Sequence, residues 1–132
     1  MKTSKLKSIL TFILLAAVTF TACKKDDPAP KSTIEGSWAG KYGSGNSEPV
    51  SAYNFNILPN GILQATTTEK VVVGVGTWKL EAGAFYGIYT YNNSNYTYNL
   101  AGKYNQAANT ISGSWGKGQT DPSEGKFILN KQ

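Results

Sequence analysis

The side chains that carry most enzyme chemistry are scarce in this chain. It has no histidine and no arginine, and its one cysteine, Cys23, lies close to the start of the sequence. The commonest general base and metal ligand near neutral pH is therefore missing. The acids beyond residue 33 fall mostly at predicted strand ends or in loops: Glu35, Glu48, Glu69, Glu81, Asp121 and Glu124. Their spacing does not indicate a glycosidase pair. From these absences together we expect that the protein is not an enzyme and that it has no metal site and no cofactor.

Charge argues against nucleic-acid binding, and the spacing of the glycines argues against a phosphate-binding loop. The whole chain carries a net charge of +5, but residues 34–132 hold seven lysines against six acids, a net charge of +1. Arginine, the usual bidentate donor to phosphates and base edges, is absent from the sequence. The glycines are dispersed, and none forms a phosphate loop at the start of a helix. We therefore expect no nucleic-acid partner.

The N-terminus has the three-part pattern of a secretory signal. Lysines at positions 2, 5 and 7 precede a mostly apolar run over residues 9–20, and small residues then lead to Cys23. The run is shorter than the roughly 20 apolar residues that span a bilayer. A permanent transmembrane anchor is thus the weaker alternative to a cleaved signal.

Residues 20–23, Phe-Thr-Ala-Cys, resemble a bacterial lipobox, although phenylalanine stands where leucine is usual. The resemblance implies cleavage after residue 22 and attachment of diacylglycerol to Cys23. Each buried lipid methylene contributes about 0.8 kcal/mol, and two lipid signals already anchor a protein stably. The expected partner of this segment is therefore a membrane.

The segment after Cys23 predicts a flexible tether. Residues 24–33, KKDDPAPKST, are charged and contain proline, and they offer no large apolar side chain for a core. Lys25, Asp26 and Asp27 resemble the start of surface-exposed lipoproteins of the Bacteroidota, although a solvated linker is an equal alternative. We predict a signal peptide over 1–22, a lipidated cysteine and tether over 23–33, and a domain over 34–132. The resemblance implies lipid anchoring in the outer membrane and display at the cell surface.

Residues 34–132 show the period-two alternation of β-strands, with glycine and asparagine turns between them. Eight strands are predicted, over residues 34–42, 51–58, 62–69, 74–80, 84–91, 95–104, 109–115 and 125–130. Short turn sequences between neighbours favour a simple antiparallel meander. The predicted fold is all-β, an eight-stranded antiparallel up-and-down barrel, and a small sandwich is the alternative.

The positions of the lysines indicate which face of each strand points outward. Lys41, Lys79, Lys103 and Lys126 should point to water, so their immediate neighbours should point inward. Extended to all predicted strands except 62–69, the alternation gives an aromatic-rich interior: Gly36, Trp38, Tyr42, Tyr53, Phe55, Ile57, Gly76, Trp78, Leu80, Phe85, Tyr89, Tyr91, Tyr96, Tyr98, Leu100, Tyr104, Ile111, Gly113, Trp115, Phe127 and Leu129.

A glycine-any-tryptophan motif occurs three times, ending at Trp38, Trp78 and Trp115. We interpret it as structural: an inward glycine makes room for the indole two residues along and lets the strand bend. The motif and the strand number resemble those of the calycin group, which contains lipocalins, fatty-acid-binding proteins and avidins. This resemblance implies a small barrel with a ligand site at one end.

Avidin-like proteins are the closest resemblance within that group. Ser44 follows the first motif where that family places a biotin-contacting serine. Gly40 stands where the family has a biotin-contacting asparagine, and residues 95–104 contain no tryptophan. Biotin is therefore not predicted.

The calycin resemblance also implies which end of the barrel is open, since the first-strand tryptophan closes the other end in such barrels. The open end then carries the connections 43–50, 70–73, 92–94 and 116–124, and long loops on a rigid scaffold often bind ligands. Rings with hydroxyls offer both stacking and hydrogen bonds. The predicted ligand-binding residues are Tyr42, Ser44, Tyr53, Tyr89, Tyr91, Tyr96, Tyr98 and Trp115. A small amphiphilic or aromatic ligand is expected; the alternative is a packed barrel that serves as a structural or interaction domain of the cell envelope.

Overall fold

The computed structural model describes residues 34–132, which form eight β-strands and one short 3-10 turn. The strands are β1 (Gly36–Ser44), β2 (Ser51–Leu58), β3 (Ile62–Thr66), β4 (Val72–Glu81), β5 (Ala84–Tyr91), β6 (Thr97–Asn105), β7 (Thr110–Lys117) and β8 (Gly125–Lys131), and η1 (Pro59–Gly61) follows β2. The predicted signal peptide, Cys23 and the tether lie outside the described residues. Within residues 34–132, no helix has the length and apolar character needed to cross a membrane.

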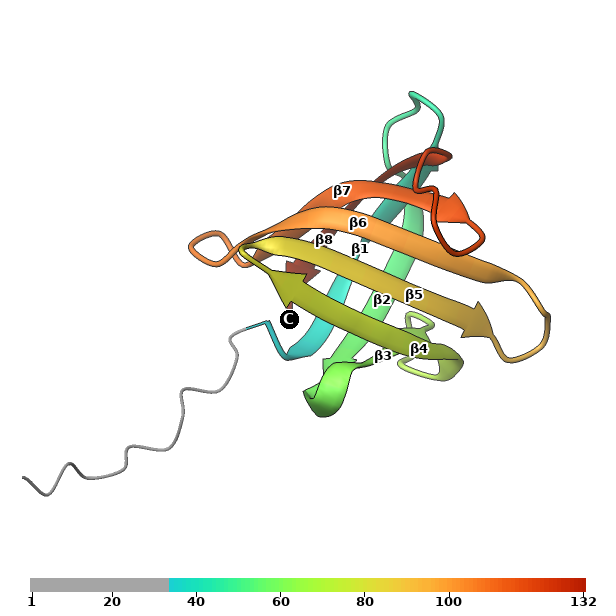
Figure 1. Ribbon diagram of the computed structural model, residues 1–132, viewed down its shortest axis with the longest axis horizontal. Helices are drawn as coiled ribbons and strands as arrows, with labels where there is room; N and C mark the ends of the chain where they lie inside the picture. Colours follow the sequence, from blue (N-terminus) through green and yellow to red (C-terminus); the bar gives the residue numbers. More distant parts are fainter. Residues whose placement is uncertain (1–33) are drawn as a thin grey trace, which may run out of the picture. The chain divides into compact units, whose positions relative to one another are not determined.

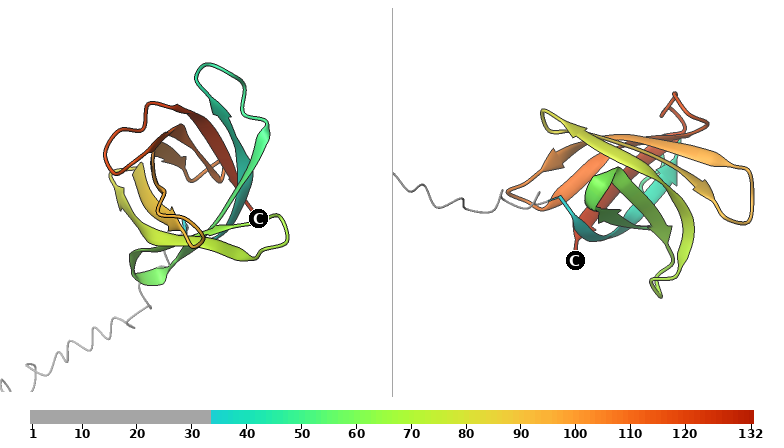
Figure 2. Two further views of the ribbon diagram at one scale, coloured as in Figure 1. Left: turned by 90° about the vertical axis from the view of Figure 1, so that its right-hand side faces the viewer. Right: turned by 60° about the horizontal axis from the view of Figure 1, so that its bottom comes forward.

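Each strand pairs antiparallel with the next along the chain, and β1 also pairs with β8, which closes the sheet. Figure 1 shows successive strands side by side, and the end-on view in Figure 2 shows them as a ring. Around Trp38, for example, Phe55 lies opposite on β2 and Lys131 on β8. The prediction of an all-β, eight-stranded up-and-down barrel is confirmed. The sandwich alternative is wrong, because a sandwich consists of two separate sheets.

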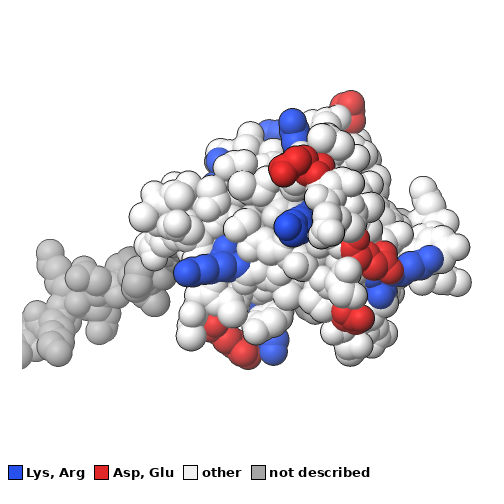
Figure 3. Space-filling view, turned by 90° about the horizontal axis from the view of Figure 1, so that it is seen from above, with Lys and Arg blue, Asp and Glu red and all other residues white. Residues whose placement is uncertain are grey.

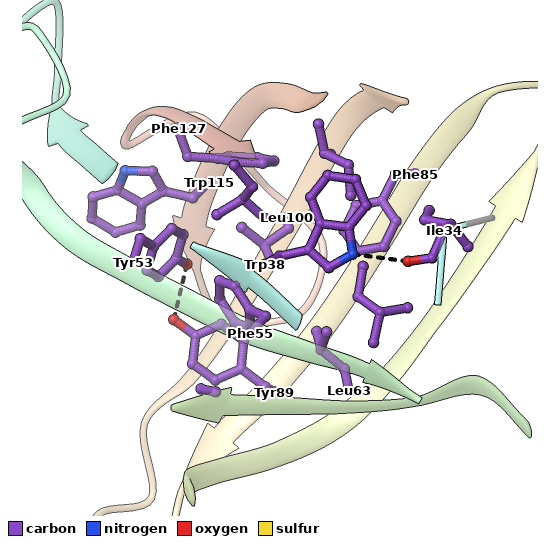
Figure 4. Packing of buried hydrophobic residues seen from close by; sticks show 14 residues of the cluster. Ile34, Trp38, Tyr53, Phe55, Leu63, Phe85, Tyr89, Leu100, Trp115 and Phe127 are labelled. Atoms are coloured by element: carbon purple, nitrogen blue, oxygen red, sulfur yellow. Dashed lines mark hydrogen bonds between the residues drawn. The ribbon is translucent and has the colours of Figure 1, made fainter. Parts of the chain in front are cut away.

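The barrel interior is filled by the side chains that alternate inward. Trp38, Phe55, Phe85 and Leu129 are each at most 1% exposed, and Figure 4 shows the aromatic rings packed against one another. The buried cluster is Ile34, Trp38, Tyr53, Phe55, Ile57, Leu63, Ala65, Phe85, Tyr89, Leu100, Ile111, Trp115, Phe127 and Leu129. Burying such side chains contributes about 1.5 to 3 kcal/mol each before entropy is counted, so this cluster is the main source of stability.

Several strand ends differ from their predicted positions. The predicted strand 62–69 ends at Thr66, because Thr67 N–H donates to Val71 O at 2.9 Å and Lys70 has a φ of 66°, which together make a turn. The predicted strand 95–104 begins at Thr97 instead. Strands β2 and β5 match their predicted bounds, since clear turn residues flank both.

The glycines of the repeated motif allow close approach of neighbouring strands. A Cβ on Gly76 would overlap the carbonyl oxygen of Ile88, and one on Gly113 would overlap that of Ala101. Both obstacles are backbone of the adjacent strand, so relaxation of a side chain could not relieve the overlap. The expected reason, room for the neighbouring indole, is thus not the one that the structure shows at these two positions.

The three tryptophans of the motif each bind a main-chain carbonyl through the indole N–H. Trp38 donates to Ile34 O at 2.8 Å, Trp78 to Leu58 O at 2.8 Å and Trp115 to Gly43 O at 2.9 Å. A buried indole N–H needs such a partner to offset its loss of water. Each tryptophan therefore joins two parts of the barrel wall or its ends.

Charged side chains are spread over the outside of the barrel. Lys41, Lys79, Lys103 and Lys126 are exposed, as the alternation predicted. Lys79 Nζ lies 3.2 Å from Glu81 Oε1, and because both side chains are exposed this ion pair contributes little to stability. On the face shown in Figure 3, lysines and acids are interspersed and neither sign forms a patch.

Candidate binding site

The loops at the predicted open end lie where the meander was expected to place them. Odd-numbered strands lead into connections over residues 45–50, 67–71, 92–96 and 118–124, whereas even-numbered strands lead into 59–61, 82–83 and 106–109. Two open-end connections are joined directly, since Gly45 N–H donates to Glu124 O at 2.7 Å. The long loops are therefore at one end of the barrel, held on paired strands.

Six aromatic side chains converge just inside this end, around a cavity of about 100 Å³. We call this set the tyrosine cup: Tyr42, Tyr53, Tyr89, Tyr91, Tyr98 and Trp115. They come from β1, β2, β5, β6 and β7. All six belong to the residues predicted to bind a ligand, and the structure brings them together.

Ring contacts run continuously around the tyrosine cup. The Tyr89 and Tyr98 rings are stacked with centroids 5.7 Å apart, and Tyr91 lies edge-on to both, at 5.3 and 5.6 Å. On the other side, Tyr42 lies 5.4 Å from Trp115 and 5.0 Å from Tyr53. Offset and edge-on pairs of this kind each contribute about 0.5 to 1.5 kcal/mol beyond the area they bury. The cup is thus a continuous aromatic wall.

A hydroxyl pair lies at the inner side of the cup. The Tyr53 and Tyr89 hydroxyls are 2.9 Å apart, and Figure 4 shows this hydrogen bond between β2 and β5. Both residues are almost fully buried, Tyr53 at 6% exposure and Tyr89 at 2%. One hydroxyl donates to the other, so both buried oxygens have a hydrogen-bond partner.

Two predicted site residues lie outside the cup. Ser44 is exposed at the end of β1, where its carbonyl accepts from Ser47 N–H at 3.1 Å and the chain turns away. Tyr96 is 54% exposed, and Lys117 Nζ lies 4.0 Å from its ring centroid. Its carbonyl accepts from Tyr91 N–H at 3.2 Å in the β5–β6 connection, so the inward alternation of β6 does not extend to it. The prediction that Tyr96 points inward is wrong.

A larger groove lies on the outer surface, with a volume of about 380 Å³. Its lining includes Lys79 of β4, Tyr86 and Ile88 of β5, Ala101 of β6 and Thr120 of the β7–β8 connection. Successive side chains of a strand alternate between its two faces. The strand residues of the lining alternate with buried residues such as Phe85 and Leu100, so they face outward. This groove was not predicted from the sequence.

Comparisons with known proteins leave the site to be interpreted from its own geometry. Neither the protein-family models, nor the curated proteins, nor the solved structures contain a match to this chain. The aromatic cup, its hydroxyl pair and the outer groove are therefore the observations on which a function must be based.

Burial raises the pKa of Tyr53 and of Tyr89 above the ordinary tyrosine value of 10.0, because the apolar surroundings disfavour a phenolate. In the unfolded chain both phenols ionise near that value, so above about pH 10 the unfolded state binds fewer protons than the folded state. The stabilising contribution is complete below about pH 10 and is lost as pH rises toward the folded-state pKa.

We therefore expect the free energy of unfolding to fall above about pH 10, by up to about 1.4 kcal/mol per pH unit for each tyrosine. Tyr53→Phe should flatten this slope by removing one of the two groups. Denaturant unfolding across that range measures the slope for both proteins. Equal slopes for wild type and variant would show that Tyr53 does not contribute.

Proposed function

We propose that this protein is a non-catalytic, lipid-anchored lipoprotein of the outer membrane whose barrel binds a small aromatic or amphiphilic ligand in the tyrosine cup. Ligand binding is supported by the convergence of six aromatic side chains, five of them with hydroxyls, on one cavity below the open-end loops, and lipid anchoring by the sequence around Cys23. Such a wall offers ring stacking and hydrogen bonds to the same ligand.

The size of the cavity narrows the ligand class. Pockets that enclose a drug-sized molecule measure about 300 to 1,000 Å³, whereas an engineered cavity of about 150 Å³ in another protein binds benzene. The cup, at about 100 Å³, therefore matches part of a single ring or a short polar end. The rest of the ligand would remain between the open-end loops, and a long acyl chain would not fit inside the barrel.

A packed barrel without a ligand is the second candidate function. It is favoured by the filled interior, in which fourteen side chains form one buried cluster and the rings of the cup already contact one another. In that case the cup tyrosines close the barrel end, and the domain acts through its outer surface as a structural or interaction unit of the cell envelope.

Titration with 4-cresol, with toluene as its matched partner without a hydroxyl, distinguishes the two candidates. We expect 4-cresol to shift the indole N–H signal of Trp115 saturably and to bind more tightly than toluene. Tyr98→Ala should weaken 4-cresol binding about two- to tenfold, equivalent to one aromatic contact of about 0.5 to 1.4 kcal/mol.

Tyr96→Ala is the matched control, because this tyrosine lies two residues away but outside the cup. It should leave the affinity for 4-cresol unchanged. Absence of any saturable shift at Trp115, or equal weakening by both variants, would contradict binding in the cup and favour the packed barrel.

A further inference from the structure

The floor of the outer groove is built from two cross-strand rows. The β-sheet register places Thr77, Ile88 and Asn99 side by side on β4, β5 and β6, and places Lys79, Tyr86 and Ala101 side by side in the next row. Tyr86 is 40% exposed and Ile88 is half-buried, although both lie on the outside of the barrel. Because Ala101 ends at its Cβ, the floor is hollowed beside the Tyr86 ring.

One wall of the groove is the β7–β8 connection, which lies across the outer face of β6 and contributes Gln119, Thr120 and Pro122. Asn99 holds this connection beside the end of β7: its Nδ2 donates to Gly118 O at 3.0 Å and Asp121 O at 3.3 Å in the connection, and to Gly116 O at 3.3 Å in β7. In the part of the chain that the structure describes, Asn99 is the one polar side chain other than tyrosine and tryptophan that is buried.

The connection is fixed at both of its ends as well. Gly118 N–H donates to Thr97 O at 2.7 Å, and Glu124 N–H donates to Trp115 O at 2.9 Å. Gly118 has a φ of 95°, which favours glycine, and a Cβ on Gly116 would overlap the carbonyl oxygen of Asp121. The wall of the groove is therefore preformed, as small-molecule sites usually are.

Volume and lining point to a small organic ligand. The groove, at about 380 Å³, has a volume within the range of small-molecule pockets, whereas the tyrosine cup, at about 100 Å³, is smaller than that range. Tyr86, Ile88 and Ala101 make the middle of the floor apolar, and Thr77, Gln119 and Thr120 add a few polar groups to the lining. This mixture suits a flat apolar body with a polar substituent.

Lys79 decides the charge of that substituent. It is the one charged side chain among the residues that line the groove, and its Nζ lies 5.1 Å from the Tyr86 ring centroid. Its ion pair with Glu81 is exposed, at 63% for each side chain, and the ammonium has three donors, so a second carboxylate can bind beside Glu81. An ammonium next to an apolar floor complements an acid group on a planar ring.

We propose that the outer groove is a second ligand site, separate from the tyrosine cup, and that it binds planar aromatic carboxylates. The ring system lies on Tyr86, Ile88 and Ala101, and the carboxylate faces Lys79. The wall formed by residues 119–122 covers one edge of the ring.

The test is an NMR titration of the purified protein with 2-naphthoate, in parallel with neutral 2-naphthalenemethanol and cationic 2-naphthylmethylamine. We expect saturable shifts at the amides of Ile88, Ala101 and Thr120, with naphthoate tightest and the amine weakest. Lys79→Gln should weaken naphthoate about two- to fivefold, the range of an exposed charge pair, and leave the alcohol unchanged. Lys103→Gln, an exposed lysine of β6 that does not line the groove, is the matched control.

Ala101→Phe provides a steric test, because the added ring fills the hollow floor. It should weaken the acid and the alcohol alike by more than about tenfold without changing 4-cresol binding at Trp115. Shifts confined to the cup, equal weakening of acid and alcohol by Lys79→Gln, or no saturable shift in the wild type would each overturn the proposal. Since the groove is detected at Ala101 and the cup at Trp115, failure of one site is distinguishable from failure of the other.

Discussion

Replacing Trp38 with alanine is expected to lower the free energy of unfolding by about 3 to 5 kcal/mol, the usual cost of deleting a buried aromatic ring. Trp38 is 1% exposed, and its ring lies edge-on to Tyr104 with centroids 6.1 Å apart. Its indole N–H also donates to Ile34 O, which ties the start of the domain to the core. The substitution removes ring packing and this hydrogen bond together, and denaturant unfolding measures the loss.

Two further variants separate these contributions. Trp38→Phe retains a ring but leaves the Ile34 carbonyl without the indole donor, so its cost should be smaller than that of Trp38→Ala. Tyr86→Ala removes an aromatic side chain that is 40% exposed on the outer face, and its cost should stay below about 1 kcal/mol. If Trp38→Ala cost no more than Tyr86→Ala, the ring of Trp38 would not be a central part of the core.

The fold could be predicted from sequence because the chain repeats one simple pattern. Alternation fixes which face of each strand is apolar, and turn residues such as those at 59–61 and 82–83 separate consecutive strands. Short connections leave neighbours along the chain as neighbours in the sheet, and eight strands in sequence order can then close at β1 and β8. Strand identity therefore followed from local chemistry.

Strand ends and the reason for each glycine depend on contacts that alternation does not contain. Thr66 ends β3 because the following residues form a hydrogen-bonded turn, although their sequence still reads as a strand. Gly76 and Gly113 are required by backbone of the adjacent strand, which lies more than ten residues away along the chain. Such requirements are visible only when the register is known.

Only the part of the candidate site that lies on regularly alternating strands could be predicted. Six residues of the cup lie inside strands or at strand ends that keep the alternation, whereas Ser44 and Tyr96 lie where the chain turns. The size of the cavity depends on how the rings pack, which composition does not determine. The outer groove depends on the position of the β7–β8 connection, which the hydrogen bonds of Asn99 fix and which alternation does not contain.

Replacing Cys23 with alanine is expected to abolish lipid attachment completely, because it removes the one thiol in the chain. Cys23 lies outside the described residues, and the prediction rests on the small residues before it and the short apolar run before those. Without the modification, cleavage after residue 22 should also fail, and the protein should accumulate at the higher mass of its precursor. Incorporation of labelled palmitate and mass spectrometry measure the two effects.

Lipid label and mass are the decisive measurements, because an uncleaved apolar run can itself hold the precursor at a membrane. Lys24→Ala is a suitable control, since it changes the next residue but retains the thiol, and it should incorporate label as the wild type does. Persistent label in Cys23→Ala would refute the assignment. Protease added to intact cells extends the test to the location of the barrel: cleavage of wild type within the tether would support surface display. Complete protection would instead place the cup and the outer groove in the periplasm, where their ligands would have to be sought.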